Sequence, residues 1–224
     1  MSKLTVSVVI AVRNGQDYLS NAIESVIGQS SPPDEIIVVD GKSTDNTAKI
    51  ARSFANIRYI LQQNQGLANA RNTGIDQARG DLIAFLDSDD YWIKEKLEIQ
   101  IQQFICDPEI QYSYSQLMFF LEPGCVLRNG YKQLQLSIEQ TGHTPGTLVA
   151  YKSLFHQIGK FNSTYKIACD LDWFTRAKDH NIRAGFVPQV LLYKRLHNNN
   201  LSGNVKAHKR EIFNVIRKSL ERNP

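Results

Sequence analysis

The sequence has 224 residues, of which 42% are hydrophobic and 21% are charged. A chain of this length and composition can bury a core as one domain, which excludes an intrinsically disordered protein. No apolar run reaches the length of a membrane-spanning helix, and the first residues lack the pattern of a signal peptide. The net charge of +4 is modest, so we expect no nucleic-acid partner.

The three cysteines, Cys106, Cys125 and Cys169, lie far apart in the sequence. They form neither a CxxC metal motif nor a disulfide framework, so a reducing compartment is expected. We therefore predict a cytoplasmic protein that meets membranes only peripherally, at the inner face.

Strand and helix patterns alternate in the first part of the chain. Helical spacing predicts helices, and β-branched runs predict strands; in chain order these are 4–12 (strand), 18–27 (helix), 35–40 (strand), 44–54 (helix), 57–61 (strand), 67–78 (helix) and 81–87 (strand). The apolar run Ile36–Val39 is typical of a strand buried on both faces, as in parallel sheets. The class is therefore α/β: a doubly wound, Rossmann-like, mostly parallel sheet flanked by helices.

The rhythm changes after Asp90. A helix is predicted near 94–105, an apolar and aromatic stretch covers 110–121, and a polar region continues through Gly146. Turn signals occur, but no flexible linker does. We expect one domain over residues 1–224, whose second half is less regular.

The end of the chain, residues 205–224, predicts a basic amphipathic helix. Ile212, Ile216 and Leu220 recur at i, i+4 and i+8 among basic residues, namely Lys206, Lys209, Arg210, Arg217, Lys218 and Arg222. We expect the three apolar side chains to pack on the core and the basic face to be solvated. Attachment to anionic lipid is the alternative.

Carboxylates close two of the predicted strands. In open parallel sheets, ligands bind outside the carboxyl ends of the strands. One strand ends in Asp40, and another ends in Asp87, followed by Ser88, Asp89 and Asp90. Such clustered negative charge favours a bound Mg²⁺ or Mn²⁺ shared with substrate phosphates. The alternative is an acidic loop that caps the helix near Lys94.

The segment after Asp40 contains Gly41-Lys42-Ser43, but it is not a P-loop, because Ile36 stands where the first glycine is required. Ser43 or Thr44 is predicted to cap the next helix, with Asp45 in its first turn. The Asp40 carboxylate could accept hydrogen bonds from a base or a ribose.

Four motifs, in this order, resemble family 2 glycosyltransferases of the GT-A fold. They are Ser7–Asn14, Ile37–Asp45, Gly66 with Ala70–Gly74, and the acidic run ending in Asp90. The resemblance covers roughly residues 4–203 and is strongest up to Trp92. It implies a nucleotide-sugar-binding half over 1–92 and an acceptor-binding, catalytic half over 93–204.

The resemblance also implies roles for individual residues near the donor. It implies that the base and ribose pocket is lined by Ala11, Arg13 and Asp40, that Arg71 lies beside the nucleotide, and that Asp87 and Asp89 bind Mn²⁺ or Mg²⁺. Asp89 is the direct metal ligand in this interpretation, and Asp87 could contact the ribose instead. Gly41-Lys42 departs from the family, in which an acidic residue and then glycine usually follow the first Asp.

In the second half, Ala168–Phe174 resembles the segment in which the family places its catalytic base. Asp170 is the candidate for the base, although Cys169 replaces a frequent acidic residue, and Asp170 or Asp172 could instead be a helix N-cap. A helix N-terminus would keep Asp170 ionised. By the same resemblance, Arg195 would contact the diphosphate and His197 would complete the metal site. His143 could line the acceptor pocket, and the alternative is a plain loop histidine.

The resemblance implies an inverting transferase that moves a sugar from a nucleoside diphosphate sugar, with a UDP-sugar favoured, to a hydroxyl group. The acceptor would be a saccharide or a lipid-linked molecule in cell-surface polysaccharide or glycolipid synthesis. Two alternatives are a nucleotidyltransferase, which usually has a Gly-rich loop that is missing after the first strand, and a non-catalytic sugar-nucleotide-binding protein. A dehydrogenase is disfavoured because no G-x-G-x-x-G follows a strand.

Overall fold

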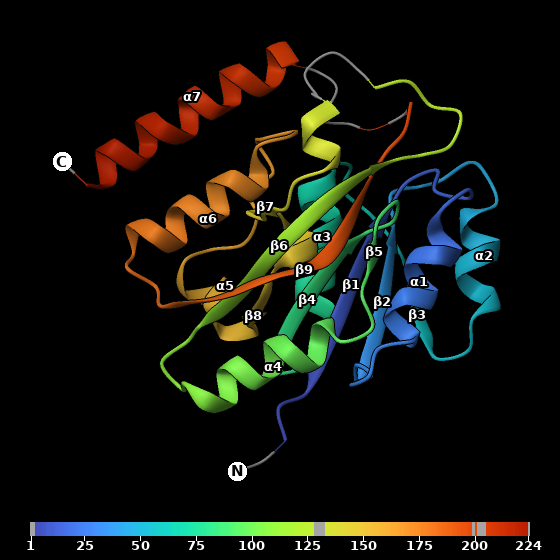
Figure 1. Cartoon of the computed structure of the whole chain (residues 1–224), viewed down its shortest axis with the longest axis horizontal. Helices are drawn as coiled ribbons and strands as arrows, with labels where there is room; N and C mark the ends of the chain where they lie inside the picture. Colours follow the sequence, from blue (N-terminus) through green and yellow to red (C-terminus); the bar gives the residue numbers. More distant parts are fainter. Residues whose placement is uncertain (1–2, 128–132, 199, 201–204, 224) are drawn as a thin grey trace.

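The computed structural model describes residues 3–127, 133–198, 200 and 205–223 (Figure 1). Its strands are β1 (Val6–Val12), β2 (Glu35–Asp40), β3 (Ile57–Leu61), β4 (Leu82–Asp87), β5 (Tyr91–Trp92), β6 (Tyr112–Leu121), β7 (Gln140–Thr141), β8 (Val149–Tyr151) and β9 (Ala184–Leu196). Its α-helices are α1 (Leu19–Ile27), α2 (Thr47–Ser53), α3 (Leu67–Gln77), α4 (Lys96–Cys106), α5 (Lys152–Gln157), α6 (Cys169–Asp179) and α7 (Val205–Arg222). Two short 3₁₀ helices are η1 (Gln133–Leu136) and η2 (Pro145–Thr147).

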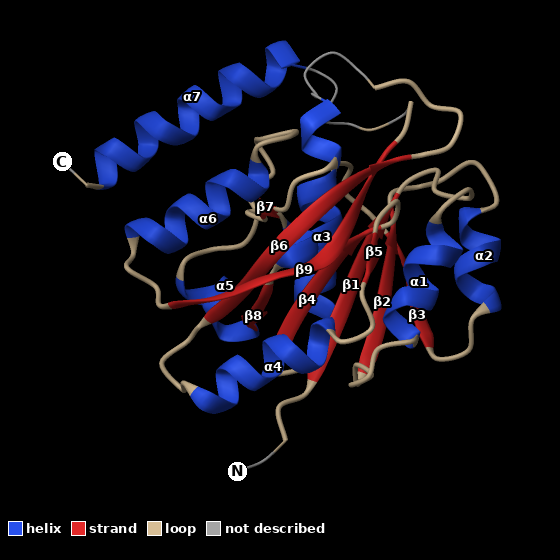
Figure 2. Cartoon of the chain, in the orientation of Figure 1, coloured by secondary structure: helices blue, strands red, loops and turns tan. Residues whose placement is uncertain are grey.

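In the described part of the chain, the strands form a single sheet in the order β3-β2-β1-β4-β8-β6-β9-β5, with β7 paired to β6 (Figure 2). β1 runs parallel to both β2 and β4. In this register Ala11 lies beside Asp87 on one side, and Val12 lies beside Asp40 on the other. The two predicted acidic strand ends therefore meet at one edge of the sheet.

The second half of the chain extends the same sheet. β8 is antiparallel to β4 and β6, and the long strand β9 runs parallel to β6. The predicted α/β class is confirmed. Strand β9 was not predicted, because Pro188 and the charged residues near its end interrupt the apolar pattern, and the β6–β9 register shifts between Ser115 and Leu117.

Helices cover both faces of the sheet. One core contains side chains of α3, α5 and α6, and the other contains side chains of α1, α2 and α4. Alternation along β1 supplies both cores, since Val9 faces the first, while Val8 and Ile10 face the second. Burial on both faces explains the continuous apolar runs in β1, β2 and β4.

The start of α2 differs from the prediction. The helix begins at Thr47 rather than at Thr44, and its N-cap is Asn46. Ser43 does not cap the helix, because its hydroxyl donates a hydrogen bond to Asp40 Oδ1 at 2.6 Å. Asp45 precedes the helix, where its Oδ1 accepts the Thr47 N–H at 3.0 Å.

The terminal helix α7 packs against α6, and its side chains are described from Lys209 onward. Val215 is its buried apolar residue, with 1% of its surface exposed. The predicted packing face is wrong, because Ile216 and Leu220 are 48% and 67% exposed. None of the helices in the described ranges combines the length and apolarity needed to span a bilayer.

Candidate active site

Strand β4 leads into residues 87–90, which we call the acidic loop, at the carboxyl edge of the sheet. Asp87 is the last residue of β4. It accepts hydrogen bonds from Arg71 Nη2 at 2.6 Å and from Lys194 Nζ at 3.2 Å. Burial works against the charged form, but Arg71 and Lys194 outweigh it and hold the pKa of Asp87 below its usual range. Asp87 is therefore an ionised carboxylate paired with two cations.

Lys194, on β9, links Asp87 to Asp90. Its Nζ lies 2.9 Å from Asp90 Oδ2. Burial raises the pKa of Asp90 to about 7, although Lys194 opposes that shift. Burial also disfavours the ammonium group, but Asp90, Asp87 and Asp89 raise the pKa of Lys194 above its usual value. One charged lysine thus holds two carboxylates of the loop in place.

Asp89 is the most exposed carboxylate of the loop, with 28% of its side chain accessible. Its Oδ2 lies 3.0 Å from His197 Nε2 and accepts a hydrogen bond from Asn200 Nδ2 at 3.2 Å. The His197 ring packs against Tyr18, with ring centroids 4.9 Å apart. A carboxylate oxygen and an imidazole nitrogen therefore meet at the edge of the sheet.

Asp89 and His197 form the part of this edge that best suits a divalent metal. Mg²⁺ is commonly bound through one or two carboxylates together with substrate phosphates and water. Among the described residues, no three His, Cys, Asp or Glu side chains converge as a metal cage. Asp87 fits a direct metal contact less well, because both its oxygens are already paired with Arg71 and Lys194.

Arg195 forms hydrogen bonds and ring contacts that fix the acidic loop to neighbouring segments. Its Nε donates to the carbonyl oxygen of Asp89 at 2.9 Å, and its Nη2 donates to Asn21 Oδ1 at 3.0 Å. Its Nη1 forms an ion pair with Glu122. The guanidinium also lies over two aromatic rings, 4.6 and 4.7 Å from their centroids. These contacts position the loop, and the predicted contact with a diphosphate stays a prediction.

The residues predicted to line the nucleotide pocket lie around the ends of β1 and β2. Asp40 is 1% exposed. Its Oδ1 accepts from the backbone and hydroxyl of Ser43 at 2.8 and 2.6 Å, and its Oδ2 accepts from the Tyr59 hydroxyl at 2.7 Å. Ala11 is buried, whereas Arg13 is exposed. A nucleotide contact by these residues stays a prediction.

The loops after β1 and β2 are hydrogen-bonded to each other. The Asn14 N–H donates to Ser43 Oγ at 2.8 Å, and Asn14 Oδ1 accepts the Thr44 N–H at 2.9 Å. Asn14 and Lys42 have left-handed backbone conformations, with φ of 52° and 62°. These hydrogen bonds fix the two loops at the carboxyl edge of the sheet, where Arg13 is exposed.

The first turn of α6 carries Asp170 toward the same edge. Arg71 Nη1 donates to Cys169 Sγ at 3.7 Å, and its charge also acts on Asp170. Burial raises the pKa of Asp170, and Arg71 only partly opposes this. The direction is opposite to the one expected from a helix N-terminus, because burial outweighs the lowering effects of Arg71 and of the Leu171 backbone N–H. A raised pKa suits a side chain that must take up a proton.

Asp172 has a structural role. It is 2% exposed and accepts from Arg176 Nε at 2.9 Å. Arg176 in turn donates to the carbonyl oxygens of Gly159 and Lys160, at 2.9 and 2.7 Å. The N-cap of α6 is Ala168, so the N-cap interpretation of Asp170 or Asp172 is wrong. The geometry favours Asp170 over Asp172 as the base.

His143 belongs to a row of aromatic rings. Its ring is stacked on Tyr114, with centroids 5.0 Å apart, and meets Phe174 edge-on at 5.3 Å. Tyr114 also contacts Phe186, which is 39% exposed. Phe174 follows Asp170 by one turn of α6. The predicted contact of His143 with an acceptor stays a prediction.

The scaffold that carries this edge has a sequence pattern shared with known enzymes. The pattern of "Glycosyl transferase family 2" matches residues 7–158, more than half of the chain. This chain belongs to glycosyl transferase family 2. The family predicted from the four motifs is confirmed. The matched residues include Arg71 and the acidic loop and end before Asp170, Arg195 and His197.

Relatives of this chain include proteins that are named as glycosyltransferases. TuaG of Bacillus subtilis, named for teichuronic acid biosynthesis, is 37% identical over 130 residues, which are 56% of this chain and 51% of TuaG. The Escherichia coli UDP-Glc:alpha-D-GlcNAc-diphosphoundecaprenol beta-1,3-glucosyltransferase WfaP is 38% identical over 125 residues, 54% of this chain and 49% of WfaP. The chain thus spans about half the length of these relatives.

Solved structures confirm the GT-A fold. The structure of S. aureus TarS residues 1–349 in complex with UDP-GlcNAc superimposes with a TM-score of 0.71 and covers 90% of this chain and 61% of the TarS chain. The two sequences are 22% identical, so the likeness concerns the fold. Like TarS, this family 2 chain has a mostly parallel sheet flanked by helices.

Two polar residues of the site were missed from the sequence. Lys194 directly precedes Arg195, and Asn200 lies in the Asn-rich segment after His197. Their roles depend on β9, which returns to the acidic loop from far along the chain. The basic pair Lys194-Arg195 directly after the apolar residues Val190–Tyr193 is the signal that could have identified Lys194 as a partner of the predicted acidic edge.

Proposed function

We propose that this family 2 chain transfers a sugar from a nucleoside diphosphate sugar to a hydroxyl acceptor, with inversion at the anomeric carbon. The observation that carries the proposal is one shared edge. There, Asp89 lies 3.0 Å from His197, and the ion pair of Asp87 with Arg71 interacts with the charge of Asp170. This edge offers a candidate metal-binding pair and a half-buried carboxylate that can accept a proton.

A UDP-sugar is the favoured donor. The TarS structure of the same fold was solved with UDP-GlcNAc, and WfaP is named for a UDP-Glc donor. In the proposed complex, Asp89 and His197 hold Mn²⁺ or Mg²⁺. That metal, when bound, supplies positive charge for the diphosphate oxygens. Arg13, which is exposed and directly follows β1, is proposed to contact the nucleotide.

The residues of this chain supply the remaining chemistry. The acceptor hydroxyl oxygen attacks the anomeric carbon, the bond from that carbon to the diphosphate oxygen breaks, and the diphosphate leaves with the electron pair. Asp170 takes the hydroxyl proton, which its raised pKa favours. Arg71 and Lys194 keep Asp87 ionised and fixed, so the acidic loop is already in position before substrate binds.

The acceptor is proposed to be a saccharide or a lipid-linked saccharide in cell-surface polysaccharide or glycolipid synthesis. The names of TuaG and WfaP support this class, and that of WfaP specifies a diphosphoundecaprenol-linked acceptor. The ring row of Tyr114, His143 and Phe186 offers apolar faces on which a sugar ring could stack.

The donor site is tested by calorimetric titration of UDP, GDP and dTDP into the protein, with Mn²⁺, Mg²⁺ or chelator. We expect metal-dependent binding of UDP that falls at least ~10-fold in Asp89→Ala, a loss of one metal ligand. Asp76→Ala, which removes an exposed carboxylate on α3, is the control and should bind as wild type does. Equal binding by Asp89→Ala and wild type would contradict the assigned metal ligand.

A further inference from the structure

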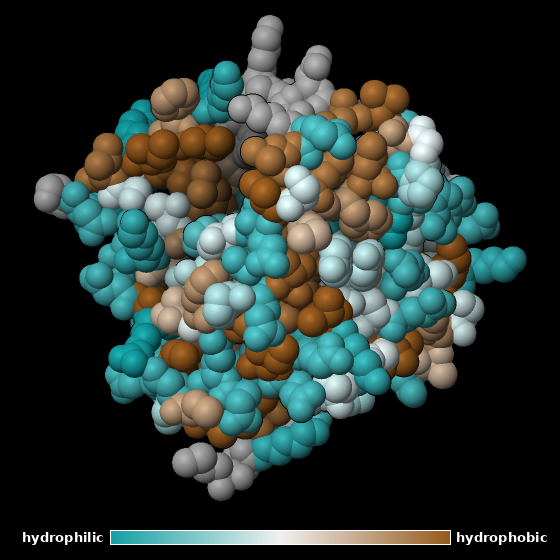
Figure 3. Space-filling view, in the orientation of Figure 1, coloured by the Kyte–Doolittle hydropathy of each residue, from teal (hydrophilic) through white to brown (hydrophobic). Residues whose placement is uncertain are grey.

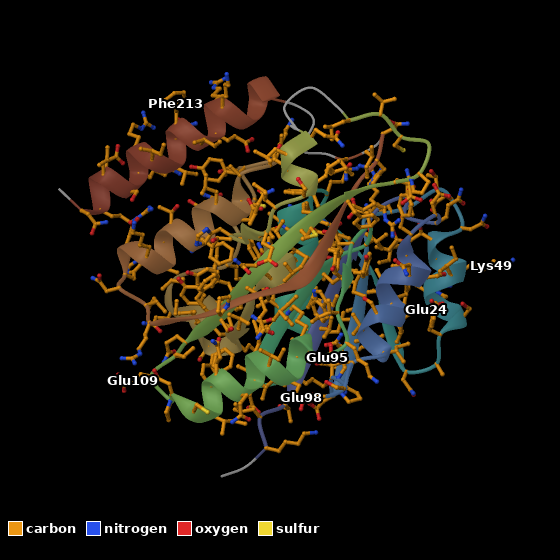
Figure 4. All side chains as sticks on the ribbon, viewed as in Figure 1. Glu24, Lys49, Glu95, Glu98, Glu109 and Phe213 are labelled. Atoms are coloured by element: carbon orange, nitrogen blue, oxygen red, sulfur yellow. The ribbon has the colours of Figure 1, made fainter. Side chains whose placement is uncertain are left out.

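The outer face of α7 carries an apolar stripe. Phe213, Ile216 and Leu220 are 70%, 48% and 67% exposed. Their spacing of three and four residues places them on one side of the helix. Figure 4 shows Phe213 at the outer margin of the molecule, pointing away from the sheet, and Figure 3 shows hydrophobic surface along α7. We call these three residues the α7 stripe.

Polar contacts on the opposite side of α7 keep the stripe turned outward. Ser219 Oγ and Arg222 Nε each donate to Asp179 at the end of α6, both at 2.7 Å. The Glu211 carboxylate accepts the backbone N–H groups of three consecutive residues before α6, 166–168, at 2.9–3.0 Å. Turning α7 to bury the stripe would break these bonds and expose Val215.

Positive charge surrounds the stripe. Lys209, Arg210 and Arg217 are exposed on α7. Arg217 makes a 3.7 Å contact with Glu221, an exposed pair of the kind that contributes little. A helix with bulky apolar residues on one side and exposed cations beside them is typical of helices that lie in the interface of an anionic bilayer.

Other apolar side chains are exposed at the same end of the molecule. Val126 is 79% exposed in the segment after β6, and Leu134 is 64% exposed in η1. In Figure 1 these segments and α7 lie at the end of the molecule opposite the N-terminus. The carboxyl ends of β1 and β4, and hence the acidic loop, point toward this end (Figure 1).

We propose that the α7 stripe docks on an anionic lipid bilayer. Phe213, Ile216 and Leu220 enter the boundary between headgroups and acyl chains, while Lys209, Arg210 and Arg217 contact anionic headgroups. A second copy of this chain is a poorer partner, because a symmetric pairing of stripes would bring the same cations together. Docking in this orientation turns the acidic loop toward the membrane surface. The proposal goes beyond sugar transfer and does not rest on it.

The test uses the full chain and sedimentation with vesicles of pure phosphatidylcholine or of phosphatidylcholine with about 30% phosphatidylglycerol, a composition that supplies surface charge. We expect binding to the anionic vesicles that weakens with added salt. The stripe variant Phe213→Ser/Ile216→Ser/Leu220→Ser should lose at least ~10-fold in partitioning, since buried apolar area drives such binding. The control Ile27→Ser/Leu61→Ser/Ile105→Ser changes three exposed apolar residues elsewhere and should bind as wild type does.

Three results would overturn the proposal. The first is no binding of wild type to anionic vesicles, and the second is equal binding by wild type and the stripe variant. The third is wild-type self-association in light scattering that the stripe variant loses, which would assign the stripe to a second copy. UDP titration of the stripe variant keeps the two proposals separate: unchanged UDP binding with lost vesicle binding leaves the donor site intact.

Discussion

At the scale of single residues, the charged groups of the site differ in how they are compensated. Asp87 lies between Arg71 and Lys194, and Asp172 is paired with Arg176. Asp170 is instead influenced by Arg71 without a hydrogen bond to it among the described contacts, and burial raises its pKa. Carboxylates that are fixed by cations suit structural roles, whereas a carboxylate with a raised pKa suits proton transfer.

The two acidic residues of α6 should therefore respond in opposite ways to substitution. Asp170→Asn should lower turnover by ~10²-fold or more while the melting temperature changes little, because it removes the proposed base without removing a buried ion pair. Asp172→Ala should destabilise the fold by about 3 kcal/mol, because Arg176 loses its buried partner. Thermal denaturation and the rate of nucleotide release measure both effects. Full turnover by Asp170→Asn would show that the base lies elsewhere.

Lys96 is a buried basic residue that lies outside the site. It is 0% exposed, its Nζ has no hydrogen-bond partner in the described part of the chain, and it lies 4.1 Å from the centroid of the Trp92 ring. Although the ring would favour a cation, burial dominates and lowers the pKa of Lys96 well below its usual value. The folded protein therefore favours the neutral amine.

Replacing this lysine by methionine should stabilise the protein. We expect Lys96→Met to gain at least ~1 kcal/mol at pH 7, because it removes an unpaired buried amine. Lys96 binds a proton more readily in the unfolded chain than in the folded one. The wild-type free energy of unfolding therefore rises with pH, by up to ~1.4 kcal/mol per pH unit, until about pH 10, where the unfolded chain also loses the proton. The difference in the free energy of unfolding between Lys96→Met and wild type should therefore become smaller as the pH rises. Urea unfolding from pH 7 to 10 checks this, with the exposed Lys94→Met as the control.

At the scale of elements, the rim of the site depends on loops with left-handed residues. Lys42 has φ of 62° just after β2, at the position where the family usually has glycine. A side chain in this conformation costs about 1 kcal/mol or more. The departure from the family motif that is visible in the sequence is therefore also a point of backbone strain.

Restoring glycine at this position should relieve that strain. Lys42→Gly is expected to stabilise the fold by about 0.5–1 kcal/mol, because glycine adopts positive φ without a steric penalty. Lys49→Gly, an exposed lysine inside α2, is the matched control and should destabilise by about 1 kcal/mol. Chemical denaturation of both variants provides the comparison. Similar losses in both would indicate that Lys42 is not strained.

At the scale of the whole molecule, the sequence predicted the first half well and the second half only in part. The strands over 35–40 and 57–61 were predicted with the bounds that the structure gives. The first is an apolar run buried on both faces, and the second is a half-buried edge strand whose β-branched and aromatic residues are typical of strands. Lys194 was missed because its role depends on its contact with Asp90, which is far from it in the sequence and is brought close only by the pairing of β9 in the sheet. The prediction of which face of α7 packs on the core was wrong, because hydrophobic periodicity identifies an apolar stripe but does not show what covers that stripe.

The shared edge is proposed to transfer a glycosyl group and to release a nucleoside diphosphate. The most direct measurement is chromatographic identification of the nucleotide product after incubation of wild type with UDP-GlcNAc, UDP-glucose, GDP-mannose or dTDP-glucose and Mn²⁺ or Mg²⁺. We predict metal-dependent release of UDP from a UDP-sugar, and loss of that release in Asp170→Asn with donor binding retained. Release of nucleoside monophosphate instead, or tight donor binding with no release in the presence of saccharide and lipid-linked acceptors, would show that the protein does not have the proposed activity.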